Sequence, residues 1–168
     1  MSDIALAVFA GGAAAALLDG LAATVDFRIR GISFTRLWQS VASGALGPSS
    51  FQRGSASVFL GLAFHVLIAM TAALFFNTAA MYAPILLVHY VLFGTLYGIA
   101  VFTFMNLVVI PLSAMPPRPF SLATTIRQLL IHILFVGLPI SIAAHCFATK
   151  NGDGPYPSPA SKTITPDR

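Results

Sequence analysis

Charged side chains are scarce in this sequence. Asp, Glu, Lys and Arg together make up 8% of the 168 residues, against about 25% in ordinary soluble domains, while apolar residues make up 57%. A soluble fold of this size could not cover its surface with so few polar groups. The charged residues also cluster between long stretches without charge, as a hydrocarbon solvent requires. The composition therefore predicts an integral membrane protein.

Glutamate is absent, and cysteine occurs once, as Cys146. A single cysteine excludes an intrachain disulfide. Asp19 is the one carboxylate inside a long apolar stretch, and the sequence has no nucleophile elbow, phosphate loop, thiol pair or carboxylate dyad. These absences argue against hydrolytic and phosphoryl chemistry. We therefore expect a protein that is not an enzyme and does not bind nucleic acid.

Four apolar stretches are long enough to cross a bilayer as helices. A bilayer core of about 30 Å needs roughly 20 helical residues at 1.5 Å each. The stretches cover residues 4–25, 55–77, 84–112 and 125–147. They lack the period-two alternation of membrane β-strands. The sequence thus predicts an all-α transmembrane bundle of four helices over residues 1–148, followed by a disordered tail over 149–168 that is rich in Pro and Gly.

Prolines predict distortions in the last two of these helices. Proline donates no backbone hydrogen bond and clashes with the preceding turn. Pro111 therefore predicts a bend in the third helix, which is also longer than the bilayer requires. Gly137 and Pro139 predict a second distortion in the fourth helix.

The connection between the first two helices contains an amphipathic segment at residues 34–46. Its apolar and polar side chains fall on opposite helical faces, Ser33 suits an N-cap, and Gly47 with Pro48 suits a stop. Two interpretations remain open. The segment could lie in the membrane interface as a short helix anchored by Trp38, or it could be an ordinary loop helix that packs beneath the bundle.

Basic residues near the helix ends predict the orientation in the membrane. Six lie in or beside the first and third connections, and three lie in the tail: Arg28, Arg30, Arg36, Arg53, Arg118 and Arg127 against Lys150, Lys162 and Arg168. Cytoplasmic loops carry the excess of Lys and Arg. We therefore expect the first and third connections in the cytoplasm and both termini outside it.

Each predicted helix carries one polar side chain at a similar depth. These residues are Asp19, His65, Asn106 and His132, roughly 9–15 Å from the predicted cytoplasmic helix ends at 1.5 Å per residue. An ionisable group at the centre of a membrane helix raises the free energy of insertion by roughly 2.5–3.5 kcal/mol, so each such group is expected to have a structural or functional role. The sequence predicts that they form one polar layer.

Three interpretations of this layer remain open. The two histidines, His65 and His132, could ligate a haem iron from both sides or hold a metal together with Asp19. Asp19 and a histidine could instead relay protons or line a path for a small solute. The simplest interpretation is that the polar side chains hydrogen-bond between helices and only hold the bundle together.

Small residues predict where helices approach each other closely. Gly94 and Gly98 form a GxxxG step on the third helix, and the first helix is rich in Gly and Ala around Gly11 and Gly12. In lipid, helix association depends on close backbone contact at such steps. The step could serve an interface within the bundle or between protomers, and an interface within the bundle is the simpler expectation.

Three segments resemble known proteins: YGIAVFTFMNLVVIPLSAMPPRPFSL (97–122), ASGALGP (42–48) and HILFVGLPI (132–140). They resemble a group of small bacterial inner-membrane proteins that are described only as uncharacterised. The resemblance implies a four-helix fold and a location in a bacterial inner membrane. It implies no activity and no ligand residues.

These observations favour a non-enzymatic accessory or interaction subunit of a membrane. Its expected partners are the lipid bilayer and either another membrane protein or a second copy of the chain. The first alternative is a small oligomeric permease, or a proton or solute path, that uses the layer of Asp19, His65, Asn106 and His132. The second is an electron carrier with haem between His65 and His132; no other cofactor is expected.

Overall fold

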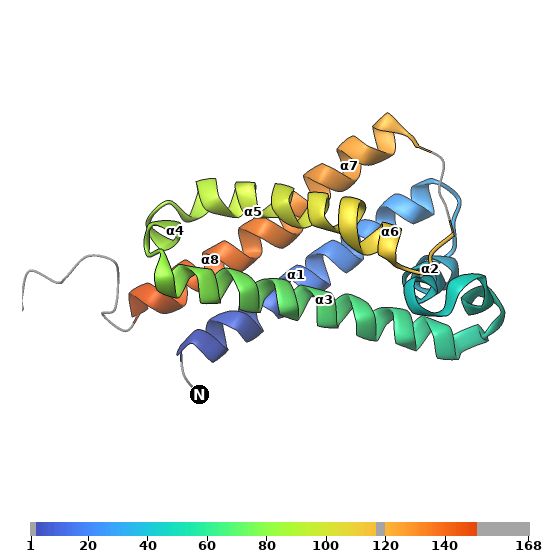
Figure 1. Cartoon of the computed structure of the whole chain (residues 1–168), viewed down its shortest axis with the longest axis horizontal. Helices are drawn as coiled ribbons and strands as arrows, with labels where there is room; N and C mark the ends of the chain where they lie inside the picture. Colours follow the sequence, from blue (N-terminus) through green and yellow to red (C-terminus); the bar gives the residue numbers. More distant parts are fainter. Residues whose placement is uncertain (1–2, 117–119, 151–168) are drawn as a thin grey trace, which may run out of the picture.

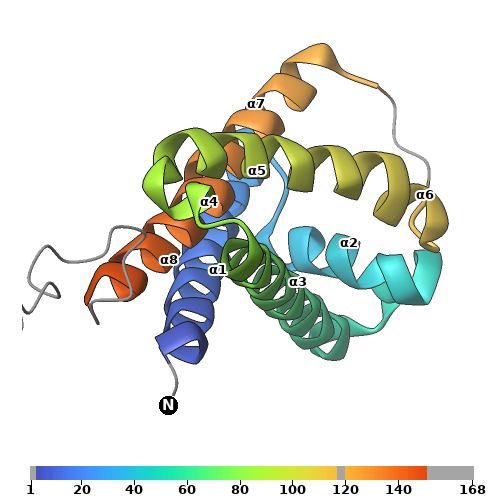
Figure 2. The same cartoon turned by 60° about the vertical axis from the view of Figure 1, so that its left-hand side comes forward.

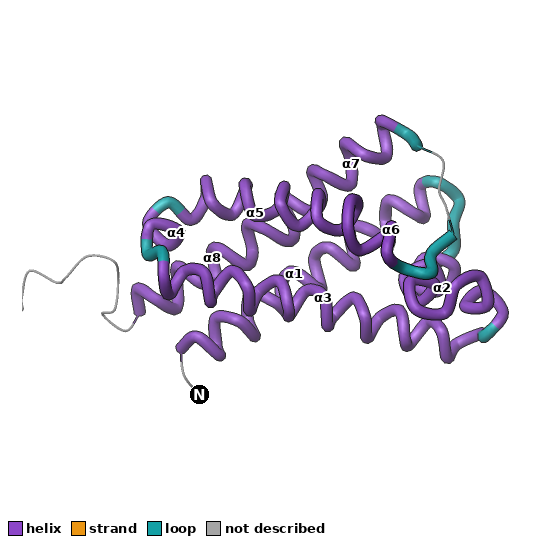
Figure 3. The backbone as a smooth tube through the Cα atoms, in the orientation of Figure 1, coloured by secondary structure: helices purple, strands orange, loops and turns teal. Residues whose placement is uncertain are grey.

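The computed structural model describes residues 3–116 and 120–150, and this part of the chain is helical with short loops (Figures 1 and 3). The elements are α1 (Asp3–Ile29), α2 (Phe34–Leu46), η1 (Gly47–Gln52), α3 (Gly54–Tyr82), α4 (Ile85–Val88), α5 (Tyr90–Phe104), η2 (Met105–Val109), α6 (Ile110–Leu112), α7 (Leu122–His132), η3 (Ile133–Gly137) and α8 (Leu138–Lys150). The predicted disordered tail lies outside the described residues from 151 onward.

Four helical stretches are long and apolar enough to cross a membrane, which confirms the predicted number. They are Ile4–Ile29, Gly54–Tyr82, Tyr90–Leu112 and Leu122–Ala148, with 26, 29, 23 and 27 residues. At 1.5 Å per residue these lengths correspond to about 35–44 Å, which exceeds the hydrocarbon thickness of a bilayer. The third stretch combines α5, η2 and α6, and the fourth combines α7, η3 and most of α8.

Both proline-containing helices widen into a π-turn directly before the proline. In η2 the Ile110 amide donates to the Met105 carbonyl, and in η3 the Leu138 amide donates to the Ile133 carbonyl. Each bond spans five residues, and the next residue is Pro111 or Pro139, which has no amide to donate. The distortions predicted from the prolines therefore take the form of π-turns, through which the helices continue.

The helix α1 lies between α3 and α8, and α5 packs on η3 and α8 (Figure 2). The shared core consists of small side chains around Phe76 and Ile140, including Ala15, Ala73 and Ala144. Small side chains allow the helix backbones to approach closely, which is how helices associate in lipid.

The GxxxG step lies at an interface within the chain. A Cβ atom on Gly98 would lie 2.6 Å from the Ile133 Cα, and one on Gly94 would collide with Ser141. Gly137 meets the same step from the other side, since its Cβ would collide with the Gly94 carbonyl. The step and Gly137 thus set the crossing of α5 over η3.

The helices α3 and α5 touch through Tyr97 and separate toward α2. The Tyr97 hydroxyl donates to the Ala72 carbonyl at 2.7 Å, and the Tyr97 ring lies edge-on to Phe76 at 5.1 Å between centroids. From this contact onward α5, η2 and α6 run away from α3, and α2 lies across the end of the space between them (Figures 1 and 2).

Candidate functional site

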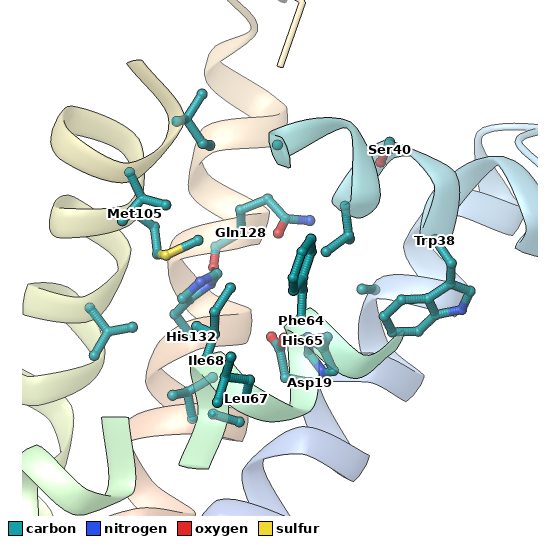
Figure 4. Close-up of a pocket in the computed structure, with 18 of the residues that line it drawn as sticks. Asp19, Trp38, Ser40, Phe64, His65, Leu67, Ile68, Met105, Gln128 and His132 are labelled. Carbon is teal, nitrogen blue, oxygen red and sulfur yellow. Dashed lines mark hydrogen bonds and ion pairs between the residues drawn. The ribbon is translucent and has the colours of Figure 1, made fainter. Parts of the chain in front are cut away.

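A cavity of about 370 Å³ lies at the α2 end of the bundle (Figure 4). Its walls come from α1, α2, α3, α5 with η2 and α6, and α7 with η3. Most of the lining is apolar; the polar side chains in it are Asp19, Trp38, Ser40, His65, Ser113, Gln128 and His132. The volume falls in the range of about 300–1,000 Å³ that is typical of small-molecule sites.

The helix α2 lines one end of this cavity and forms at the residues that the sequence predicted. The Ser33 hydroxyl accepts the Arg36 amide at 3.2 Å as an N-cap, and Gly47 ends the helix with φ 59°, a conformation that favours glycine. A Cβ on Gly61 would collide with the Trp38 carbonyl, so α2 lies directly on α3. The Ala114 amide donates to the Gly44 carbonyl at 2.9 Å, which joins the segment after α6 to α2.

Trp38 is buried against α1 and α3 and is not exposed on the surface of the structure. Its side chain is 4% exposed, its indole nitrogen is buried, and its ring lies edge-on to His65 at 5.1 Å between centroids. The interpretation of Trp38 as an interfacial anchor is therefore corrected: the apolar face of α2 packs under the bundle. The physical reason is that Gly20 and Gly61 leave room for the indole and for the backbone of α2.

Asp19 and His65 form a pair on one wall of the cavity. The His65 Nδ1 lies 3.8 Å from the Asp19 Oδ2, and the His65 Nε2 lies 2.9 Å from the Ala16 carbonyl oxygen (Figure 4). Both side chains are largely buried, with 15% and 16% exposed. Gly20 makes this contact possible, because a Cβ there would lie 3.2 Å from the His65 Nε2.

The hydrogen-bond partner of His65 Nε2 determines the role of this nitrogen. A carbonyl oxygen only accepts hydrogen bonds, so the His65 Nε2 donates to Ala16. The other ring nitrogen, Nδ1, faces the Asp19 carboxylate at 3.8 Å, which is too long for a direct hydrogen bond.

His132 lies on another wall of the same cavity. Its Nδ1 donates to the Gln128 carbonyl at 2.8 Å, and its ring lies edge-on to Phe102 at 5.6 Å between centroids. The structure thus brings Asp19, His65 and His132 to one cavity.

Asn106 does not reach this cavity. Its side chain is exposed and donates back to the Phe102 carbonyl of its own helix at 2.8 Å. The neighbouring Met105 and Val109 occupy the face that lines the cavity. Asn106 is the next residue after Met105 in this turn, so its side chain points to a different side of the helix.

A second buried carboxylate, Asp26, was not singled out from the sequence. Its side chain accepts from Arg30 at 2.8 Å, from Arg127 at 2.9 Å and from the Gln128 amide at 3.3 Å. Because Arg127 and Gln128 belong to α7, Asp26 attaches α7 to the end of α1. The spacing of four residues between Asp26 and Arg30 was the available signal, since such a pair supports a helix that continues past residue 25.

One ring nitrogen of each cavity histidine is taken up by a backbone carbonyl. The His65 Nε2 donates to Ala16 and the His132 Nδ1 donates to Gln128, so each ring has one other nitrogen that could offer a lone pair to a metal. Within residues 3–116 and 120–150, no group of three or more His, Cys, Asp or Glu side chains is placed to hold a metal ion. Ligation by His65 would use Nδ1, and the Nε2 could keep its bond to the Ala16 carbonyl.

No family model, curated protein or solved structure matches this chain significantly. The function therefore has to be inferred from the site itself. The arrangement offers an apolar cavity with one carboxylate, one histidine paired to it and a further histidine. Such a site has space for a small apolar molecule beside a carboxylate and two imidazoles, and its described lining contains no set of groups arranged as nucleophile and base.

Proposed function

We propose that this chain crosses a membrane four times and binds a small lipid-soluble molecule in the cavity beside Asp19 and His65. The observation that carries the proposal is the cavity of about 370 Å³, which encloses a buried ionisable pair among apolar walls. A polar pair at this depth is costly in lipid and is a functional hypothesis by default.

The outer surface of the helices supports the membrane part of this proposal. Only 11–33% of each 18-residue apolar window is buried inside the structure. Large side chains such as Phe59, Phe75 and Leu107 are about two-thirds or more exposed, at 71%, 68% and 72%. Soluble proteins rarely expose such extensive apolar surface to water. In the proposed arrangement the lipid of a bilayer covers this surface. The resemblance to small bacterial inner-membrane proteins supports an inner-membrane location.

The orientation can be tested by cysteine labelling. Gln52 lies at the α2 end, where Arg28, Arg30, Arg36 and Arg53 gather, and Tyr82 lies at the opposite end; both are exposed. In a Cys146→Ser background, we expect a membrane-impermeant maleimide to label Tyr82→Cys in intact cells and Gln52→Cys only after lysis. Labelling of Gln52→Cys in intact cells would reverse the proposed orientation.

The lining of the cavity suggests how its ligand arrives. Leu67 and Ile68 of α3 belong to the lining and are also exposed on the outer surface, at 61% and 37%. These exposed side chains make the α3 side of the cavity a route by which a molecule could enter it. A ligand dissolved in the bilayer would enter by this route.

Binding can be followed with the intrinsic fluorescence of Trp38. It is the one tryptophan of the chain and lines the cavity. We expect neopentylbenzene, a neutral apolar probe, to change the Trp38 emission saturably in detergent or nanodiscs. Val41→Phe, which fills the cavity, should weaken this response at least tenfold, whereas Val91→Phe on the outer surface of α5 should leave it unchanged. A non-saturable response, or equal effects of both variants, would refute the proposed site.

The second candidate function is an accessory subunit that docks on another membrane protein or on a copy of itself. The observation that favours it is the uneven burial of the helices: the window of α5 to α6 is 11% buried, against 33% for α1. A partner helix could cover this face. Purification in a mild detergent should then yield a stoichiometric complex, and a chain that stays monomeric and alone in several detergents would exclude this role.

A further inference from the structure

We propose that the cavity binds its ligand through a hydroxyl group that donates a hydrogen bond to the Asp19 carboxylate, so that the ligand is a neutral, lipid-soluble alcohol or phenol. This inference rests on the proposed function, because it assigns the chemical class of the molecule that the cavity takes up. It is carried by the polar groups of the lining, which offer several hydrogen-bond acceptors and few donors.

The first observation is that Asp19 lacks a hydrogen-bond donor. Within residues 3–116 and 120–150 its carboxylate receives no hydrogen bond, and the His65 Nδ1, at 3.8 Å from the Oδ2, is too far away to donate one. The Asp19 side chain is nevertheless largely enclosed, with 15% exposed. Buried polar groups are nearly always hydrogen-bonded, because a carboxylate without a donor raises the free energy of the folded protein. A molecule in the cavity could supply the donor.

Another carboxylate of α1 provides the contrast. Asp26 lies outside the cavity and accepts from Arg30 at 2.8 Å, from Arg127 at 2.9 Å and from the Gln128 amide at 3.3 Å. The described part of the chain thus supplies three donors to the carboxylate outside the cavity and none to the carboxylate that lines it.

The other polar side chains of the lining have few hydrogens to offer. The hydroxyl groups of Ser40 and Ser113 each donate to the backbone carbonyl three residues earlier, at 2.7 Å. The indole nitrogen of Trp38 is buried, so a molecule in the cavity cannot reach it. The Gln128 amide donates one of its two hydrogens to Asp26. Its second hydrogen is the donor that the described side chains of the lining leave for a ligand.

The two imidazoles add acceptors instead. The His65 Nε2 donates to the Ala16 carbonyl at 2.9 Å, and the His132 Nδ1 donates to the Gln128 carbonyl at 2.8 Å. In the neutral rings the other nitrogens, His65 Nδ1 and His132 Nε2, therefore carry lone pairs. A ligand that itself offers only acceptors, such as a ketone or an ether, would leave these nitrogens and Asp19 without a hydrogen.

A hydroxyl group is the kind of donor that suits this lining. Hydrogen bonds to an ionised carboxylate are stronger than those to a neutral acceptor, so Asp19 is the expected partner of the hydroxyl. A neutral hydroxyl also brings no charge through the lipid, in contrast to an ammonium group. The remainder of the ligand would lie against the apolar walls, which include Ala69, Ala72 and Val101.

The test compares three probes of nearly the same shape. Menthol donates a hydrogen bond, menthone has the same carbon skeleton and only accepts, and p-menthane has no oxygen. Binding is followed by the saturable change in Trp38 emission, with the full chain in nanodiscs and with concentrations expressed relative to lipid so that partitioning cancels. We expect menthol to bind at least about tenfold more tightly than menthone or p-menthane, as a hydrogen bond to a charged acceptor should provide.

Two variants test the role of Asp19. Asp19→Leu removes the acceptor, so menthol should lose its advantage while p-menthane still binds. Asp19→Asn offers N–H donors in the same place, so the affinity for menthone should rise relative to that for menthol. The matched control is Asn106→Leu, which also replaces a polar side chain of a long apolar helix but lies outside the cavity, and it should keep the wild-type preference.

The outcomes separate this inference from the proposed function. Equal affinities of the wild-type chain for menthol and menthone, as expected if water alone satisfies Asp19, would overturn the inference and leave the cavity function standing. A preference for menthol that survives in Asp19→Leu would overturn the assignment to Asp19. Failure of both p-menthane and neopentylbenzene to bind saturably would instead overturn the proposed function. Should the Asp19 variants fail to fold, the three probes on the wild-type chain decide alone.

Discussion

The crossing of α5 over η3 makes a quantitative prediction at Gly98. In Gly98→Ala the new Cβ would lie 2.6 Å from the Ile133 Cα, 2.7 Å from the His132 carbonyl oxygen and 3.0 Å from the Ile133 nitrogen. All three atoms belong to the backbone, so no side chain can rotate away and the two helices must separate. Overpacking of this kind costs about 1–3 kcal/mol. We expect the free energy of unfolding to fall by that amount.

The matched control is Gly44→Ala on α2. A Cβ there would meet only the Ser113 Cβ at 3.8 Å, an ordinary contact. Since alanine restricts the unfolded chain more than glycine does, this variant should gain about 0.4–1 kcal/mol. Both variants can be compared by equilibrium unfolding with SDS in mixed micelles, with the oligomeric state measured in parallel. A Gly98→Ala protein of wild-type stability, or one that changes only its oligomeric state, would refute the assignment of this step to an interface within the chain.

Two further predictions concern Asp26 and Trp38. Asp26→Asn should weaken the attachment of α7 by about 1–2 kcal/mol, which is less than for a fully buried pair because Arg127 is half exposed and can rehydrate. Amide hydrogen exchange over residues 122–132 should then accelerate. The control is Arg30→Gln, which should affect α7 less because Arg30 pairs with Asp26 within the end of α1. Trp38, at 4% exposure, should emit at short wavelength and resist quenching by aqueous acrylamide, whereas the double variant Trp38→Phe with Phe34→Trp should be quenched, since Phe34 is 46% exposed. Strong acrylamide quenching of the wild-type chain would contradict the packing of α2 beneath the bundle.

The features that the sequence predicted are those that depend on local chemistry. Apolar length sets the number of long helices, and four were found. The missing amides of Pro111 and Pro139 require a distortion at each site, although the sequence did not show that it would be a π-turn. The cap at Ser33 and the stop at Gly47 delimit α2 at the expected residues.

The features that it could not predict depend on rotation about each helix axis. Long helices that are apolar on every side do not reveal which face meets a neighbour, so Asn106 was grouped with Asp19 although its side chain points outward. The burial of Trp38 depends on space at Gly20 and Gly61, which belong to the helices α1 and α3 before and after its own. Likewise, Asp26 acquires its partners Arg127 and Gln128 only through the packing of α7 against α1.

The exposure of Leu67 and Ile68 has a consequence for the strength of binding that a solute needs under the proposed function. With these lining residues facing the bilayer, the reservoir of the proposed ligand would be the lipid and not the surrounding water. A hydrophobic solute accumulates in that reservoir by partitioning, so its local concentration far exceeds its aqueous one. A weak intrinsic interaction would therefore suffice for high occupancy of the proposed site, and selectivity among membrane-dissolved molecules would depend on their fit to the cavity more than on affinity.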